Sequence, residues 1–226
     1  MSHKVFQDRL ARLEGRLLEM SYSVQRLVES AVTFALTSDG SLEDVRVADS
    51  AIDAEEVAIE EECIELLALH QPMARDLRLL VTILKINSDL ERIGDHAVNI
   101  AEAAERLQRS VQPPAMPPEV PEMSRIAQEM LRDAMEALVH RNAEEAQDVR
   151  ARDDRVDGLH ESVFRVMLTH MLEANISACL QVILISRNLE RIADLATNIA
   201  EDVVFMVEGI TVRHAGAPEP ATPPEA

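Results

Sequence analysis

The sequence contains two stretches in which acidic and amide side chains recur at the same spacing. Residues 90–102 read LERIGDHAVNIAE and residues 189–201 read LERIADLATNIAE, so ten of thirteen positions are identical after a shift of 99 residues. The first copy carries Glu91, Asp95 and Asn99, and the second copy keeps the same three residue types. On a helix that rotates about 100° per residue, side chains four positions apart share one face. Each stretch therefore presents a row of two carboxylates and one amide.

A second acidic pair precedes each of these stretches. The pattern Asp-x-x-x-Asp at residues 49–53 returns at residues 153–157, after 104 residues. Like charges four residues apart destabilise an isolated helix, so rows kept in both repeats favour a bound counter-charge, with a solvated acidic face as the alternative. If the acidic helices of each repeat pack side by side, their oxygens suit a cation such as iron, zinc or magnesium. The predicted metal ligands are Asp49, Asp53, Glu91, Asp95 and Asn99 in the first repeat, and Asp153, Asp157, Glu190, Asp194 and Asn198 in the second.

The same residues argue against several kinds of catalytic site. A buried di-iron oxidase needs Glu-x-x-His pairs, and the nearest sequence, Asp157-Gly-Leu-His160, occurs once and begins with Asp. The sequence has no glycine-rich phosphate loop and no Gly-x-Ser-x-Gly motif. Cys63 and Cys179 lie in helical patterns without a second thiol nearby, which is typical of buried apolar side chains. We therefore expect no catalytic residues.

The helices that position these acids follow from the helix breakers and the apolar period. Nine of the ten prolines fall within residues 113–121 and 218–224. The first cluster predicts an extended linker over residues 111–121, and the second belongs to a tail, 211–226, that we expect to be disordered. Elsewhere apolar residues recur at threes and fours, which predicts helices near 4–36, 42–70, 72–109, 121–141, 144–171 and 175–209. Pro72 fits a first helical position, Asn175 an N-cap and Gly209 a C-terminal stop.

The repeat and the helix pattern together predict the fold class. Each repeat holds three long helices with apolar stripes, and such helices bury their stripes by forming a bundle. We expect an all-α fold of six helices, arranged as two tandem, pseudo-symmetric three-helix bundles at residues 4–110 and 122–210. The proline-rich linker joins them.

Composition limits the classes of partner. The 226 residues carry 22 Lys and Arg against 41 Asp and Glu, a formal net charge of −19, and only 2% of the residues are aromatic. A negative field and few aromatic faces disfavour binding to nucleic acid. No apolar stretch is long enough to span a membrane, and the N-terminus lacks the features of a secretory signal. These observations predict a soluble, cytoplasmic protein.

The repeated motif also resembles a known family. The doubled Glu-Arg-Ile-x-Asp-x-x-x-Asn, the segment QPMARDLR at residues 71–78 and the two Asp-x-x-x-Asp pairs occur in the order found in the PhoU family of phosphate-signalling regulators. The resemblance covers about residues 4–209 and implies two three-helix bundles with surface metal clusters on the acidic motifs. Each predicted carboxylate matches the family pattern. Ala193 and Leu195 stand where the motif has Gly and His, so the second site lacks one ligand available to the first.

The resemblance further implies an adaptor function. PhoU-like proteins repress the phosphate-starvation response when phosphate is plentiful and modulate high-affinity phosphate uptake. The implied partners are the ATPase subunit of the phosphate ABC transporter and its sensor histidine kinase, with membrane contact only through them. The apolar helix faces are compatible with a homodimer. Two alternatives stay open: a metal-dependent hydrolase or metal-storage protein that uses the same carboxylates, and a structural protein whose acids only keep it soluble.

Overall fold

The computed structural model describes residues 3–171 and 175–210, and all of its regular structure is helical. Three helices precede the linker and four follow it in the described part of the chain. They are α1 (His3–Thr37), α2 (Leu42–His70), α3 (Ala74–Gln108), α4 (Glu119–His140), α5 (Ala143–Arg150), α6 (Asp153–His170) and α7 (Ile176–Glu208). The expected disorder of the tail concerns residues 211–226, which lie outside the described part.

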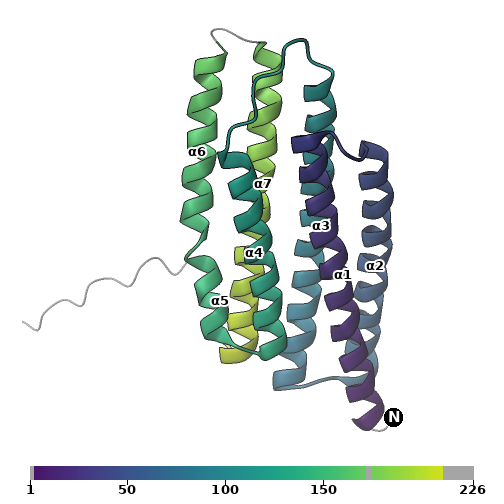
Figure 1. Cartoon of the computed structure of the whole chain (residues 1–226). Coiled ribbons are helices and arrows are strands. Elements are labelled where there is room, and N and C mark those ends of the chain that lie inside the picture. Colours follow the sequence, from purple (N-terminus) through teal and green to yellow (C-terminus); the bar gives the residue numbers. More distant parts are fainter. Residues whose placement is uncertain (1–2, 172–174, 211–226) are drawn as a thin grey trace, which may run out of the picture.

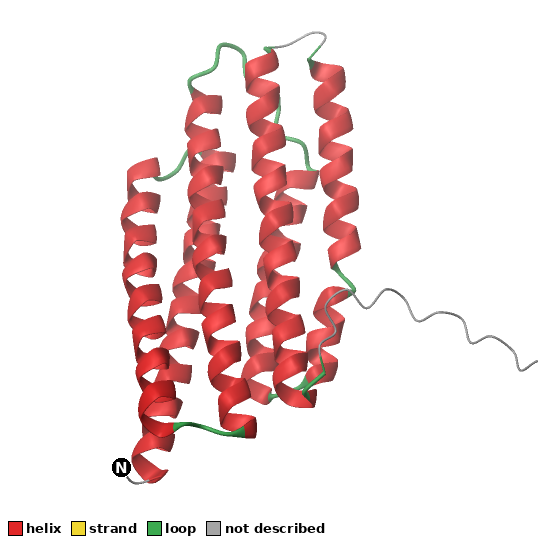
Figure 2. Cartoon of the chain, turned by 180° about the vertical axis from the view of Figure 1, so that it is seen from behind, coloured by secondary structure: helices red, strands yellow, loops and turns green. Residues whose placement is uncertain are grey.

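The helices form two bundles that lie side by side. The first contains α1, α2 and α3, the second contains α4 to α7, and all the helices run roughly along one direction (Figure 1). The interface between the bundles is made chiefly by α3 against α7, with a smaller contact between α1 and α4. Seen from behind, most loops lie at the two ends of the bundles, and the turn between α5 and α6 lies partway along the second bundle (Figure 2). The predicted all-α architecture of two tandem bundles is confirmed.

Local signals in the sequence account for most helix ends. The Ser41 side chain accepts a hydrogen bond from the Asp44 amide and so caps α2. Asn175 caps α7 by accepting from the Ser177 amide, as predicted. Gly209 ends α7 with a φ of 74°, a left-handed conformation that glycine adopts without strain. Gln71 ends α2 in the same region of backbone space, with a φ of 45°.

The predicted helix at 144–171 is wrong as a continuous element. The chain turns at Ala151 and Arg152, where the Arg152 amide bonds the Val149 carbonyl and separates α5 from α6. The two arginines at this turn pair with different helices. Arg150 forms an ion pair with Glu201 on α7, and Arg152 forms one with Asp133 on α4. The sequence has neither glycine nor proline at this point, and its apolar period continues through the break. No local signal therefore predicts it. The consequence is that Asp153 becomes the first residue of α6.

Two predicted boundaries also move. Pro72 is not the first residue of its helix, because α3 begins at Ala74 with Met73 as the N-cap. The linker ends at Pro118 rather than Pro121, because α4 begins at Glu119. Proline is tolerated in the first helical turn, whose amide groups have no partner within the helix, and Pro121 takes such a position.

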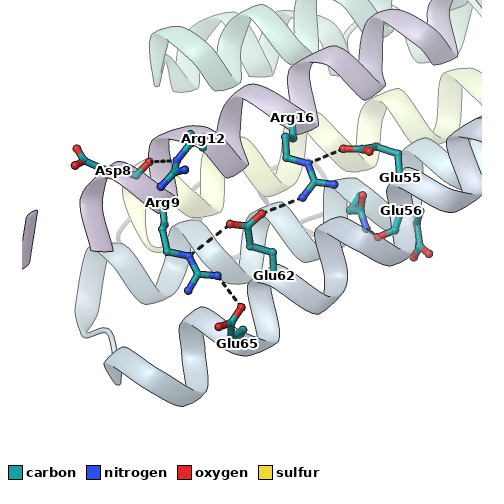
Figure 3. Close-up of polar contacts among 9 residues, drawn as sticks. Asp8, Arg9, Arg12, Arg16, Glu55, Glu56, Glu62 and Glu65 are labelled. Atoms are coloured by element: carbon teal, nitrogen blue, oxygen red, sulfur yellow. Dashed lines mark hydrogen bonds and ion pairs between the residues drawn. The ribbon is translucent and has the colours of Figure 1, made fainter. Parts of the chain in front are cut away.

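Both bundles have aliphatic cores, and α1 is fixed to α2 by ion pairs on their outer side. Arg16 of α1 contacts Glu55 at 2.8 Å and Glu62 at 2.9 Å, and Arg9 contacts Glu65 at 2.7 Å (Figure 3).

Cys63 and Cys179 are fully buried free thiols, as predicted. No helix in the described part of the chain is long and apolar enough to cross a membrane.

The interface between the bundles contains buried polar groups. Lys85 of α3 donates to the carboxylate of Asp202 on α7 at 2.9 Å, and Asp202 is only 1% exposed. The Lys85 ammonium also lies 5.1 Å from the centre of the Phe205 ring. Farther along, His96 bonds Asn188 at 2.8 Å. These contacts fix the register of α3 along α7.

Candidate functional site: two carboxylate clusters

The first acidic cluster lies between α2 and α3. Burial and, to a smaller extent, the charges of Asp53 and Asp95 together raise the pKa of Asp49 from 3.8 to about 6. Burial also raises the pKa of Glu91, helped by Asp95 and Asp53. The four carboxylates therefore act on one another across the two helices. The structure brings together the four acids that the sequence predicted.

A glycine makes room for the most buried carboxylate of this cluster. A Cβ atom placed on Gly94 would come within 2.8 Å of Asp49 Oδ1, closer than such contacts ever are. Asp49 Oδ1 is buried, and no described group donates a hydrogen bond to it. A buried carboxylate oxygen without a donor is costly unless something neutralises it.

The second cluster lies between α6 and α7. One carboxylate oxygen from each of Asp157, Glu190 and Asp194 falls within 4.8 Å of the other two. Burial and the charges of Asp194 and Asp157 together raise the pKa of Asp153 to about 6, although the Thr197 hydroxyl acts in the opposite direction. Its Oδ1 is again buried without a described donor. Because Ala193 carries the Cβ that Gly94 lacks, the close approach made by Asp49 is not open to Asp153.

The two clusters differ in an arginine that follows each motif. In the first, Arg92 turns away from the cluster and pairs with Asp89 at 3.1 Å. In the second, Arg191 pairs with Asp194 at 2.9 Å and lies 3.5 Å from Glu190. The residue corresponding to Asp89 is Asn188, which has no charge to hold the arginine. The second cluster is therefore partly neutralised by the protein itself.

The polar neighbours of the clusters are placed less symmetrically than the sequence suggests. His96 contacts Asn188 on α7, so this histidine of the first motif faces the second bundle. His160 bonds Ser186 at 3.0 Å. Burial raises the pKa of both Asp194 and Glu190. Asn99 lies on the wall of a groove between α3 and α7, and Asn198 is half-buried on α7. The role of both amides as metal ligands stays a prediction.

The ligand atoms that the two clusters offer suit a hard cation. Both clusters offer mainly carboxylate oxygens, the ligand type that magnesium, manganese and calcium prefer and that iron and zinc also accept. The Oδ1 atoms of Asp49 and Asp153 are buried and have no hydrogen-bond partner among the described residues. A cation bound at either cluster would compensate the charge of these oxygens. The sequence predicts the eight carboxylates and suggests that Arg92 and Arg191 pair with acids of a neighbouring helix. Instead, Arg92 pairs with Asp89 and Arg191 with Asp194, each on its own helix.

Known proteins match the chain over nearly its whole length. The family model of the PhoU domain matches residues 17–104 and 120–203, one match to each bundle. A phosphate-specific transport system accessory protein PhoU homolog from Pseudomonas putida is 39% identical over 222 residues, covering 96% of this chain and 87% of the relative. A homolog of the same name from Deinococcus radiodurans is 39% identical over 208 residues, covering 89% of this chain and 95% of the relative.

Solved structures agree with these matches. The crystal structure of PhoU from Pseudomonas aeruginosa is 37% identical and has a TM-score of 0.86, covering 91% of this chain and all of that one. The phosphate transport system regulatory protein PhoU from Streptococcus pneumoniae is 29% identical with a TM-score of 0.83, covering 92% and 99% of the two chains. With both of its bundles matched in order, this chain belongs to the PhoU family.

Proposed function

We propose that this protein represses the phosphate-starvation response and modulates high-affinity phosphate uptake as a cytoplasmic adaptor. Its partners would be the ATPase subunit of the phosphate ABC transporter and the sensor histidine kinase, and it would meet the membrane only through them. As a member of the PhoU family, the chain is a regulatory accessory protein and not an enzyme. The observation that carries the proposal is the match of both bundles to proteins named as accessories of phosphate-specific transport.

The surface supports contact with proteins. Phe164 and Leu168 form an exposed apolar row on α6, and Ile176, Leu180 and Leu184 form another on α7, with exposed fractions of 37–58%. Exposed apolar rows on an otherwise charged surface are typical of protein-binding faces. The excess of acidic over basic residues would steer basic partner surfaces toward the molecule.

We further propose that the two carboxylate clusters hold divalent or trivalent cations, with iron, zinc and magnesium as candidates. Asp49, Asp53, Glu91 and Asp95 would hold one, and Asp153, Asp157, Glu190 and Asp194 the other. A bound cation would neutralise a surface patch that partners then contact. The alternative of a metal-dependent hydrolase or storage protein is not favoured, because the relatives are named as transport accessories.

The regulatory proposal is tested by complementation. Cells that lack their own regulator receive this chain together with its cognate transporter and kinase, and a phosphatase reporter is measured in phosphate-rich medium. We expect repression to be restored. A reporter that stays fully active while the chain is present in soluble form would refute the adaptor function.

The metal proposal is tested on purified protein that has never been stripped. The double substitution Glu91→Gln and Asp95→Asn should lower the metal content by about one site and leave helicity intact, because both positions face the surface. Glu61→Gln, an exposed carboxylate on α2 outside the cluster, is the matched control. Equal metal content in all three proteins would rule out the first site.

A further inference from the structure

A groove between α3 and α7 gathers positive charge in an otherwise acidic protein. Its volume is about 360 Å³. Arginines from both helices line it, together with a histidine, two amides and one carboxylate. We call it the basic groove, and its defining residues are Arg106, Arg187, Arg191, His96, Asn99, Asn188 and Glu102.

Two of the three arginines of the basic groove have an acidic partner within the protein, and the third has none among the described residues. The one carboxylate of the groove, Glu102, is already paired with Arg46 at 2.7 Å and with Arg106 at 2.9 Å. Arg191 is shared with Asp194 of the second cluster. Arg187 is exposed and makes no ion pair or hydrogen bond within the described residues. The groove thus contains one uncompensated guanidinium, that of Arg187, together with the paired guanidiniums of Arg106 and Arg191.

The internal repeat allows the basic groove to be compared with the related place on the other side of the α3–α7 interface, which side chains fill. A shift of 99 residues relates Leu184 to Lys85 and Ala103 to Asp202. At the related place Lys85 and Asp202 form the buried ion pair of the interface, 2.9 Å apart, and the Phe205 ring packs beside it. In the basic groove an apolar and a small side chain replace that pair. The space and the charge are therefore particular to one side of the interface.

The groove wall is held in place by hydrogen bonds. The side-chain amide nitrogen of Asn188 donates to the Leu184 carbonyl at 2.8 Å. The Oδ1 atom of Asn188 is then available as an acceptor. His96 Nδ1 lies 2.8 Å from that oxygen and so acts as the donor. Both side chains are thereby oriented before any ligand enters. A wall of fixed orientation reduces the entropy lost on binding.

We propose that the basic groove binds a phosphate group, with Arg187 as the anchor and Arg106 and Arg191 at its sides. The planar guanidinium matches two phosphate oxygens at once, and such charge-assisted pairs are stronger than neutral hydrogen bonds. The groove volume exceeds what inorganic phosphate needs and also accommodates a small phosphorylated metabolite such as a nucleoside diphosphate. The choice of phosphate among oxoanions rests on the proposed function in phosphate regulation.

The test is calorimetric titration of the full-length chain at low ionic strength, in the presence of a chelator. Inorganic phosphate and ADP are titrated separately, and the tighter of the two identifies the source of the phosphate group. Arg187→Gln should weaken binding at least roughly tenfold, as expected for loss of a charged anchor. Arg165→Gln removes the same charge from the exposed face of α6 and should change affinity less than about twofold.

Three outcomes would overturn the site. They are the absence of saturable binding by either titrant, an equal loss in both variants, and an affinity for sulfate equal to that for phosphate. Circular dichroism confirms that each variant is folded. Failure of the site is distinguishable from failure of the adaptor function, because protein that binds no phosphate yet restores reporter repression would refute the groove alone.

Discussion

The burial of Asp49 makes a quantitative prediction about the metal-free protein. Its pKa in the folded state is about 6, against 3.8 for the ordinary side chain. The folded state therefore holds the proton more tightly than the unfolded chain, so the stabilising effect of protonation is present below about pH 4. It is lost as the pH rises through 6. A difference of about two pKa units corresponds to at most about 3 kcal/mol, and solvent screening around this partly exposed carboxylate reduces the effect on folding free energy to about 1–2 kcal/mol.

Replacing this carboxyl group by an amide removes the cost of its ionisation. At pH 7.5, with a chelator present, Asp49→Asn should raise the free energy of unfolding by about 1–2 kcal/mol. At pH 4 the substitution should have almost no effect, because the wild-type group is then largely protonated in the folded state. The measurement is urea denaturation followed by circular dichroism at both pH values.

The same substitution has the opposite effect when a cation is bound. Metal that binds only the folded state stabilises it by mass action, and Asp49→Asn removes a ligand. The gain measured in chelator should therefore shrink or reverse in saturating metal. Glu61→Gln controls for the change in net charge and should leave stability unchanged within about 0.5 kcal/mol. An Asp49→Asn protein no more stable than wild type at pH 7.5 in chelator would refute the reasoning.

Three further substitutions test the packing around the clusters and the interface. Gly94→Ala should displace the Asp49 carboxylate and weaken cation binding at the first cluster roughly tenfold. The higher helix propensity of alanine should keep the free energy of unfolding within about 1 kcal/mol of wild type. An unchanged affinity in a metal titration would contradict this prediction. Lys85→Met should cost about 1–2 kcal/mol in urea denaturation, because it removes the ion-pair partner of buried Asp202 while the Lys85 side chain is itself 39% exposed; Lys85→Arg, which keeps the charge, should recover most of the loss. Asn142→Ala removes the cap of α5, which accepts from two backbone amides, and should cost about 1 kcal/mol in thermal unfolding; no loss would show that the cap is dispensable.

The fold was largely predictable because its signals are local. Apolar residues at threes and fours place one buried face on each helix, and Asn175 and Gly209 mark the ends of α7 through their own side chain and backbone. The two-bundle organisation followed from the repeat. The break at Ala151 escaped prediction, because it depends on ion pairs that two arginines make with distant helices.

The acids of the site were predictable and their surroundings were not. Helical spacing alone puts Glu91 and Asp95 on one face, and the packing of α2 against α3 then brings Asp49 to them. Which side of α3 meets α7 is settled by packing between bundles, and no local pattern encodes it. His96 therefore looked like a ligand of its own motif, whereas it contacts Asn188 across the interface.

The asymmetry between the two clusters can be traced to one pair of related positions. Asp89 is buried and holds Arg92, which leaves the four carboxylates of the first cluster without a described arginine partner. At the related position Asn188 bonds His96 instead, and the uncharged amide leaves Arg191 to the acids of the second cluster. The first cluster thus needs an external cation more than the second. Because Arg191 both pairs with Asp194 and lines the basic groove, a charge that enters the second cluster acts directly on the groove.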